Sequence, residues 1–203
     1  MQIITIEVGM IGTNCYLINY EENKAFIIDP GDNSNAIQKK CSQLNLGPIA
    51  VLLTHGHFDH MMAAEAIKEA YGIPIYAGEA EKELLNNPRY NGSVMINKPC
   101  TLTADRWLAG QADIFGFTVI ATPGHTAGSV CYYHEKEKIL FSGDTLFKDS
   151  FGRTDLATGD MDTLAHSIKN ILFALPEDVK VYPGHGPATT IGYEKRHNMI
   201  NSF

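Results

Sequence analysis

The chain is 203 residues long, and its 44% hydrophobic and 19% charged residues are typical of a globular protein rather than a disordered one. Its formal net charge of −7 argues against a nucleic-acid partner, because binding to phosphates needs a basic surface. The longest apolar runs, such as residues 49–53, are too short to span a membrane, and the N-terminus has no signal-peptide pattern, so we expect a cytoplasmic protein without a membrane partner.

Short β-rich runs separated by turn signals fill the first third of the chain. The helix that follows them has Ile37, Cys41 and Leu44 on one face, and Gly47 marks its end. An apolar run then leads into a second helix, which Gly72 stops. The expected elements of this half are strands at 3–8, 14–19 and 25–28, a helix at 34–46, a strand at 49–53 and a helix at 58–71.

The second half begins with a long irregular connection. Residues 86–105 contain Pro88, Gly92 and Pro99, and connections of this length in compact domains are often functional. Because each half runs from strands to a helix and back to a strand, we predict an α/β fold of two packed sheets with helices outside. The elements expected after the connection are strands at 115–121, 129–134 and 139–142, a helix at 160–175 and a strand at 179–182.

The four cysteines are widely scattered and form no C-x-x-C pair. Neither a zinc-ribbon spacing nor a disulfide framework fits them, so we expect reduced, mostly buried thiols. They are Cys15, Cys41, Cys100 and Cys131.

The segment from residue 54 to residue 60 carries the strongest chemical signal. Its sequence is Thr-His-Gly-His-Phe-Asp-His, so three imidazoles and a carboxylate fall within six residues directly after a buried strand. Alternate residues of an extended chain share a face, which lets His55 and His57 point the same way. Asp59 and His60 follow where the chain turns into a helix, and they can face a second point nearby. Imidazole with carboxylate is a ligand set suited to zinc or iron.

Three more candidate ligands lie later in the chain. His125, Asp144 and His185 each follow a predicted strand, and each has a glycine directly before it. Glycine permits a tight turn and a close approach of the backbone to a crowded site. One such residue alone is weak evidence, but three in combination with the first cluster are strong evidence for a metal centre.

Four motifs in this order resemble the metallo-β-lactamase superfamily over almost the whole chain. They are H-x-H-x-D-H at 55–60, G-H-T-x-G-S at 124–129, G-D-T-L-F at 143–147 and P-G-H-G at 183–186. Together with F-G-R-T-D at 151–155, they resemble the glyoxalase II-like branch, the hydroxyacylglutathione hydrolases. The resemblance implies an αββα sandwich of two mixed β-sheets with helices on the outer faces.

The resemblance also implies the ligand sets. His55, His57 and His125 would bind one metal ion, Asp59, His60 and His185 would bind a second, and Asp144 would bridge them. We expect two divalent ions, zinc first, with iron or a mixed iron and zinc pair as the alternative. Such ions would lower the pKa of a shared water far below its usual value of about 15.7, and we expect the resulting hydroxide to attack a thioester carbonyl, with Asp59 and Asp144 as the catalytic carboxylates.

The expected substrate is a small anionic thioester of the hydroxyacylglutathione type. Arg153 stands where the glyoxalase II-like branch has a basic residue that contacts the thiol part of the substrate, although a solvated loop arginine is the alternative reading. The chain ends 18 residues after His185, so we expect one domain over 1–203 without the extra C-terminal helical region of full-length glyoxalase II. Asp29 either orients a ligand histidine or shapes a turn, and the same choice applies to Thr126 and Ser129.

Two other activities remain open on this fold. Persulfide dioxygenases share the G-R-T-D stretch and bind a single iron, and lactone hydrolases differ from thioesterases in substrate but not in metal chemistry. The other three histidines, His134, His166 and His197, are expected to lie outside the site, and the first two are expected to be surface residues.

Overall fold

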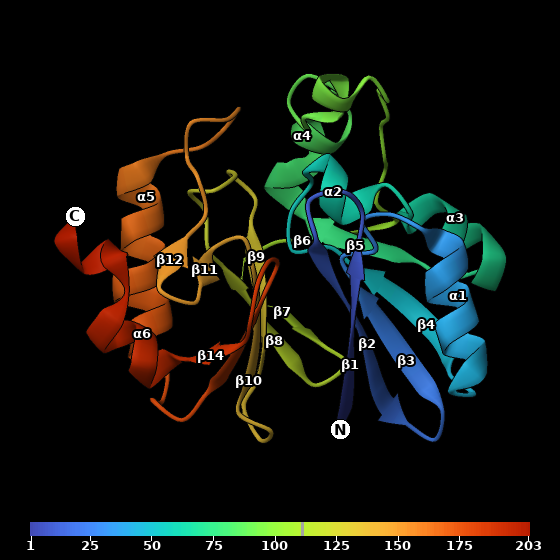
Figure 1. Ribbon diagram of the computed structural model, residues 1–203, viewed down its shortest axis with the longest axis horizontal. Helices are drawn as coiled ribbons and strands as arrows, with labels where there is room; N and C mark the ends of the chain where they lie inside the picture. The colour runs from blue at the N-terminus through green and yellow to red at the C-terminus, as the bar shows by residue number, and fades with distance from the viewer. Residues whose placement is uncertain (111) are drawn as a thin grey trace.

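Two six-stranded β-sheets pack face to face, and helices cover their outer sides (Figure 1). The structure, a computed structural model, describes residues 1–110 and 112–203. The first sheet comes from the N-terminal half of the chain, blue to green in Figure 1, and the second from the yellow to red half. This arrangement confirms the predicted αββα sandwich.

The first sheet has its strands in chain order. Its strands are β1 (Gln2–Val8), β2 (Thr13–Glu21), β3 (Lys24–Ile28), β4 (Gly47–Leu52), β5 (Ile75–Gly78) and β6 (Arg106–Leu108). The pairs β1–β2 and β2–β3 are antiparallel, and the pairs from β3 to β6 are parallel, so the sheet is mixed as expected.

The second sheet has the order β14-β13-β10-β9-β8-β7. Its strands are β7 (Ala112–Ile114), β8 (Phe117–Ala121), β9 (Val130–His134), β10 (Ile139–Gly143), β13 (Lys180–Pro183) and β14 (Thr189–Thr190). Only the pair β10–β13 is parallel among those that the structure describes. A small hairpin, β11 (Leu146–Phe147) with β12 (Ser150–Phe151), lies beside this sheet.

Short helices complete the layers. The first sheet is covered by α1 and α3, through Ile37 and Ile67, and the second by the helical stretch that begins at α5, through Leu164 and Ile168. The helices are α1 (Ser34–Gln43), α2 (Phe58–Met61), α3 (Ala64–Tyr71), η1 (Glu79–Glu81), α4 (Lys82–Leu85), η2 (Ser93–Ile96), α5 (Met161–His166), η3 (Ser167–Ile171), η4 (Leu172–Ala174), α6 (Ile191–His197) and η5 (Met199–Ser202).

The central strands are apolar on both faces because both faces are covered. In β2, Tyr16 and Ile18 join the core between the sheets, whereas Cys15 and Leu17 join the core under α1 and α3. Successive side chains of a strand point to opposite faces, so a strand buried on both sides is apolar at every position. This accounts for the continuous apolar runs of the sequence.

The helix predicted at 58–71 is wrong in one respect, because it is two helices. α2 ends at Met61 and α3 begins at Ala64. The backbone N–H of Ala63 donates to the carbonyl oxygen of Pro30 (2.9 Å) instead of continuing the helical ladder. The turn at Gly31 packs directly against the Asp59 carbonyl, where a Cβ on Gly31 would lie 1.5 Å from that oxygen. A long-range contact therefore interrupts a locally favourable helix.

Other element boundaries also differ from prediction. The strands β5 and β6 were not expected, because they are short and lie among turn-forming residues. The strand predicted at 115–121 is confirmed as β8 but begins at Phe117, because Phe115 and Gly116 both have positive φ and form the turn between β8 and the unexpected strand β7. The helix predicted at 160–175 passes from α-helical to π and then 3-10 geometry.

The expectation that the cysteines are mostly buried is confirmed. Three of the four are buried, Cys100 is half-buried, and all four are free thiols. As for membrane insertion, no helix within residues 1–110 and 112–203 combines the length and the apolar character that a membrane crossing requires.

Candidate metal centre

The seven predicted ligands gather at one edge of the sandwich. In the second sheet β10 is parallel to β13, and β9 is antiparallel to both β8 and β10. The carboxyl ends of β8, β10 and β13 therefore point the same way, and the loop after β4 of the first sheet meets them. Their positions are His55 and His57 after β4, Asp59 and His60 in α2, His125 between β8 and β9, Asp144 after β10 and His185 after β13.

The ligand atoms of these residues form three overlapping groups in which all atoms lie within 4.8 Å of one another. The groups are His55–His57–His125, His55–His60–Asp144 and Asp59–His60–His185. The first and third are the two ligand sets that the sequence implied, and the second links them. The structure thus brings all seven side chains together, and their binding of metal stays a prediction.

Asp144 lies between the two outer groups. Its Oδ2 is 3.7 Å from Nε2 of His125 and 3.5 Å from Nε2 of His185, while its Oδ1 is 3.3 Å from Nε2 of His60. On the other side of the cluster, Oδ2 of Asp59 lies 3.2 Å from Nε2 of His185. Two dications held close together need an anion between them to reduce their repulsion, and Asp144 is placed where such an anion would be.

Four buried polar atoms indicate that this cluster is built for a bound group. Within residues 1–110 and 112–203, the buried side-chain atoms without a hydrogen-bond partner are Nε2 of His55, His57 and His60 and Oδ1 of Asp144. A buried polar atom without a partner costs about 1–3 kcal/mol. All four atoms belong to residues of the cluster. The lone pairs of Nε2 of His55 and His60 and of Oδ1 of Asp144 are available to a cation, so a bound cation fits the residues present.

A buried aspartate sets the orientation of two imidazoles. Asp29 accepts hydrogen bonds from Nδ1 of His60 (2.9 Å) and from the backbone N–H (2.8 Å) and hydroxyl (2.6 Å) of Thr54. Because Thr54 gives its hydroxyl proton to Asp29, its oxygen accepts from Nδ1 of His55 (3.1 Å). Both imidazoles then carry a proton on Nδ1 and present a lone pair at Nε2. Of the two readings of Asp29, orientation of a histidine is the one that this contact confirms.

His125 is oriented in the same way by the backbone. Its Nδ1 donates to the carbonyl oxygen of Arg153 at 2.7 Å, which leaves Nε2 to face the cluster. That Nε2 lies 2.9 Å from Nδ1 of His57. His57 therefore faces the first group with Nδ1, whereas the other three imidazoles face the centre with Nε2. These four imidazoles share one geometry: one nitrogen faces the centre, and in three of them the other nitrogen donates a hydrogen bond.

The hairpin between β1 and β2 closes the centre from the first sheet. Thr13 donates its hydroxyl proton to Oδ2 of Asp59 (2.8 Å), and Asn14 donates its amide to the carbonyl oxygens of Pro183 (3.0 Å) and Gly186 (2.9 Å). Sequence reasoning missed both residues. Glycine is required in the loop that Asn14 holds, because a Cβ on Gly184 would lie 2.1 Å from Oδ1 of Asp144.

The electrostatics of the cluster favour a cation. Burial lowers the pKa of His57 to about 3 and holds that of His55 well below its usual value, so both are neutral. Burial also opposes the charged form of His185, but hydrogen bonds with Asp144 and Asp59 outweigh it and raise its pKa to about 10. The two carboxylates thus attract positive charge, and a metal ion would supply it in place of protons.

A second buried carboxylate near the centre was not predicted. Glu81 is fully buried and accepts three hydrogen bonds, from Gly56, Thr126 and Gly128. Burial raises its pKa, and those hydrogen bonds oppose the shift. Its neighbours Glu79, Lys82 and Glu83 are ordinary helix-surface residues, so the sequence gives no signal that this glutamate differs. Thr126, one of the residues with two readings, donates to it.

Arg153 is at the rim of the site with its side chain in solvent. The guanidinium pairs with both carboxylate oxygens of Asp155, at 2.6 and 2.7 Å, and its side chain is 61% exposed. Its backbone carbonyl holds His125, a role that sequence reasoning did not foresee. Of the histidines expected outside the site, His166 and His197 are exposed, and His134 is half-buried against Phe117.

A small recess opens beside Asp59. It holds about 40 Å³, and its walls are largely apolar. Two of its side chains are unusually exposed, Met10 at 82% and Ile11 at 55%. The lining residues include Met10, Ile11, Phe58, Met62, Ile96 and Lys98. Ile96 and Lys98 come from the long connection at 86–105, so that segment contributes to the surroundings of the centre.

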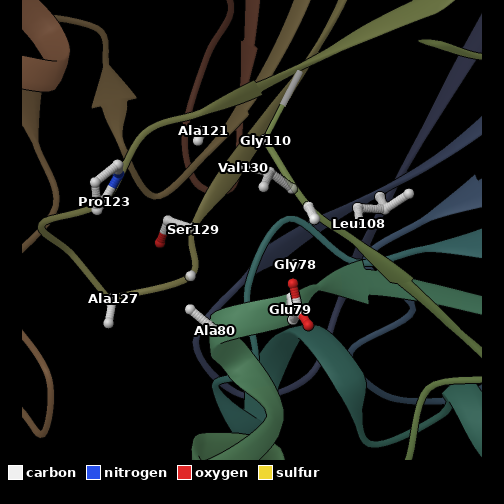
Figure 2. A pocket seen from close by; sticks show the side chains of 12 residues that line it. Gly78, Glu79, Ala80, Leu108, Gly110, Ala121, Pro123, Ala127, Ser129 and Val130 are labelled. Atoms are coloured by element: carbon white, nitrogen blue, oxygen red, sulfur yellow. The ribbon is translucent and has the colours of Figure 1, made fainter. Parts of the chain in front are cut away.

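A larger cavity of about 420 Å³ is lined in part by the loop that carries His125. Figure 2 shows Pro123, Ala127 and Ser129 of that loop along one wall, with Glu79 and Ala80 opposite. None of the predicted ligands is among the residues that line it. The cavity is therefore separate from the metal centre.

Comparison with known proteins places this geometry in a family. The family model of the metallo-beta-lactamase superfamily matches residues 8–185. The hydroxyacylglutathione hydrolase GloC of Haemophilus influenzae is 37% identical over 100% of this chain and 99% of its own length. The crystal structure of BLEG-1 B3 metallo-beta-lactamase is 42% identical, with a TM-score of 0.95 over 100% of both chains. That of TTHA1623 in a di-iron-bound form is 35% identical, with a TM-score of 0.90 over 97% of this chain and 98% of that one.

The αββα fold and the cluster of histidines and aspartates are features of a family of metallo-hydrolases. The chain belongs to the metallo-beta-lactamase superfamily. The predicted resemblance to its hydroxyacylglutathione hydrolases is confirmed by the full-length match to GloC.

Proposed function

We propose that this protein is a dinuclear metal hydrolase that cleaves thioesters of the hydroxyacylglutathione type. The observation that carries the proposal is the position of Asp144 between two groups of three ligands whose lone pairs face one another. The full-length similarity to GloC supports the thioester as the substrate. Zinc and iron both suit this donor set, and the relative with two bound irons supports a centre of two ions.

Several residues of the chain have defined roles in this reaction. Two divalent ions, when bound, would lower the pKa of a shared water and polarise the substrate carbonyl. Asp59, which accepts a hydrogen bond from Thr13, would orient that water. Asp29 keeps His60 in the tautomer that presents Nε2. A thiolate leaves without a strong general acid, because the pKa of a thiol is only about 8.5.

The surroundings of the centre support a small substrate with one apolar and one anionic part. The recess with Met10 and Ile11 beside Asp59 suits a short apolar acyl chain. The solvent-exposed guanidinium of Arg153 suits a carboxylate if the substrate displaces Asp155. We retain Arg153 as the proposed contact to the thiol part of the substrate.

A second candidate reaction is the opening of a β-lactam ring. The 42% identity to BLEG-1 over the whole chain favours it. The two reactions share the attack on a carbonyl, but they differ in the leaving group. An amide nitrogen needs a proton as it leaves, whereas a thiolate does not, so the present site is better suited to the thioester.

Metal analysis combined with turnover tests the proposal. The purified protein would be measured for zinc and iron by elemental analysis and assayed with lactoylglutathione, with a β-lactam and with a simple lactone. We expect about two metal ions per chain and fastest cleavage of the thioester. One iron per chain, with oxygen uptake on a persulfide and no thioester cleavage, would replace the proposal with a dioxygenase. Preferential cleavage of the β-lactam would leave the metal centre but change the substrate.

A further inference from the structure

One buried carboxylate links the two loops that supply the first group of ligands. Glu81 ends the turn η1 and is 0% exposed. Its Oε2 accepts from the backbone N–H of Gly56 (2.7 Å), and its Oε1 accepts from the backbone N–H of Gly128 (2.7 Å) and the hydroxyl of Thr126 (2.7 Å). The side chain therefore contacts two segments that are 70 residues apart in the sequence.

Two of the three donors lie next to predicted ligands, and the third, Gly128, is three residues from His125. Gly56 stands between His55 and His57, and Thr126 directly follows His125. A shift of Gly56 would move both histidines of the first loop, and a shift of Thr126 would move the third. Hydrogen bonds to a charged acceptor are short and roughly twice as strong as neutral ones, so Glu81 resists such shifts.

The packing around Glu81 leaves little freedom. A Cβ added to Gly128 would lie 2.5 Å from the backbone nitrogen of Glu81 and 2.7 Å from its Oε1. The loop that carries His125 is thus pressed directly against the turn that carries the carboxylate. Thr126 is further fixed because its oxygen lies 2.6 Å from Oγ of Ser129. Burying a carboxylate is costly unless donors surround it, and here each oxygen faces a backbone N–H.

The second group of ligands has different supports. Asp29 orients His60, and Thr13 holds Asp59. Neither contacts Glu81 through a hydrogen bond that the structure records. Loss of Glu81 is therefore expected to act on one group only, which separates positioning from a general loss of stability.

We propose that Glu81 is a positioning residue that sets the spacing of His55, His57 and His125, and thereby the affinity of the first metal ion. This inference rests on the proposed dinuclear centre. The residue touches no predicted ligand side chain by a recorded hydrogen bond, and it acts through the backbone of the two loops.

The test is the metal affinity of Glu81→Gln. Glutamine has nearly the same shape, but its amide NH₂ must face the N–H of Gly56 or that of Gly128, so one loop loses its acceptor. Chelator competition with zinc would give the two dissociation constants of the metal-free protein. His125→Ala and His185→Ala serve as references that identify the first and the second site. Outer contacts of metal sites typically change affinity about 10- to 100-fold, and we expect a weakening of that size at the first site alone.

Glu194→Gln is the matched control. Glu194 is also fully buried, and it accepts from the hydroxyl of Thr189, the amide of Asn198 (2.7 Å) and the backbone N–H of Asp149 (3.0 Å), none of which adjoins a predicted ligand. We expect this variant to lose stability but to keep both affinities. At a temperature where both variants remain folded, excess zinc should restore turnover to Glu81→Gln, whereas the turnover of Glu194→Gln should show the zinc dependence of the wild type.

Two outcomes would overturn the inference. Unchanged affinities in Glu81→Gln, with a lower unfolding temperature, would make Glu81 structural, and equal weakening of both sites would remove its selectivity. If Glu81→Gln does not fold, Thr126→Val serves instead, because it removes one of the three contacts to Glu81. It should lower the zinc affinity of the first site by a smaller factor. An unchanged affinity of the first site in Thr126→Val would count against the proposal. A wild-type protein that binds no metal would instead refute the metal centre itself.

Discussion

Replacement of Asp29 by asparagine tests how the fold prepares His60 for a metal ion. In the wild type, one carboxylate oxygen accepts from the backbone N–H of Thr54, and the other accepts from the Thr54 hydroxyl and from Nδ1 of His60. An amide cannot accept on both sides. If its NH₂ faces His60, the imidazole must accept at Nδ1 and carry its proton on Nε2, where it cannot bind a metal.

The alternative orientation also has a cost. If the NH₂ faces the backbone N–H of Thr54, two buried donors oppose each other. An unsatisfied buried group costs about 1–3 kcal/mol. The asparagine variant prefers the first orientation without metal, and it must switch to the second when the ion binds. Metal binding therefore bears this cost, which corresponds to a loss of about 5- to 150-fold in the affinity of the site that contains His60.

Zinc affinity by chelator competition measures this loss, with Asp160→Asn as the control. Asp160 caps α5 by accepting from the backbone N–H of Thr163, and asparagine caps a helix equally well. Wild-type affinity at both sites in Asp29→Asn would refute the argument that Asp29 fixes the tautomer of His60. Equal losses in both variants would show that the effect is not specific to the site.

Three further predictions follow from the geometry of the centre. Asp144→Ala should remove at least one metal ion per chain and nearly all hydrolysis. Among the described residues, it deletes the only carboxylate between the two ligand groups. Elemental analysis that still finds two ions, together with near-normal turnover, would contradict the bridging role of Asp144. Arg153→Ala should raise the KM for a carboxylate-bearing thioester more than the KM for an uncharged one. Asp155→Asn, which frees the guanidinium, should lower the KM for the carboxylate-bearing thioester. Equal effects of a variant on both thioesters would exclude the contact. In the metal-free protein the pKa of His185 is raised from 6.5 to about 10, so its contribution to stability is fully present below about pH 6.5 and is lost as the pH rises towards 10. The urea midpoint of unfolding of the chelator-treated wild type should therefore fall between pH 6.5 and 10, and the midpoint of His185→Gln should fall less over the same range. Parallel plots of midpoint against pH for the two proteins would argue against a charged His185.

The local pattern of the sequence was enough to predict the fold class and to select the candidate ligands. The segment 54–60 holds four candidate ligands within one short loop and the start of a helix, so their spacing alone indicates a shared centre. The central strands were predicted from the apolar runs, because a strand that is buried on both faces is apolar at consecutive residues. The short strands β5 and β6 leave no such signal, and they were missed.

Contacts between distant segments were decided only by the tertiary structure. The break between α2 and α3 depends on the carbonyl of Pro30, and the closing of the centre depends on Asn14, whose amide reaches Pro183 across 169 residues of sequence. Glu81 looks like any other glutamate of a surface helix until the fold buries it between two loops. Each ligand motif is a short segment that follows the end of one strand, so it can be recognised in the sequence. The sequence alone was therefore enough to select the side chains that could bind metal. Their orientation depends on partners brought in by folding, and for that reason the tautomers, the buried supports and the exposure of Arg153 were settled by the three-dimensional structure.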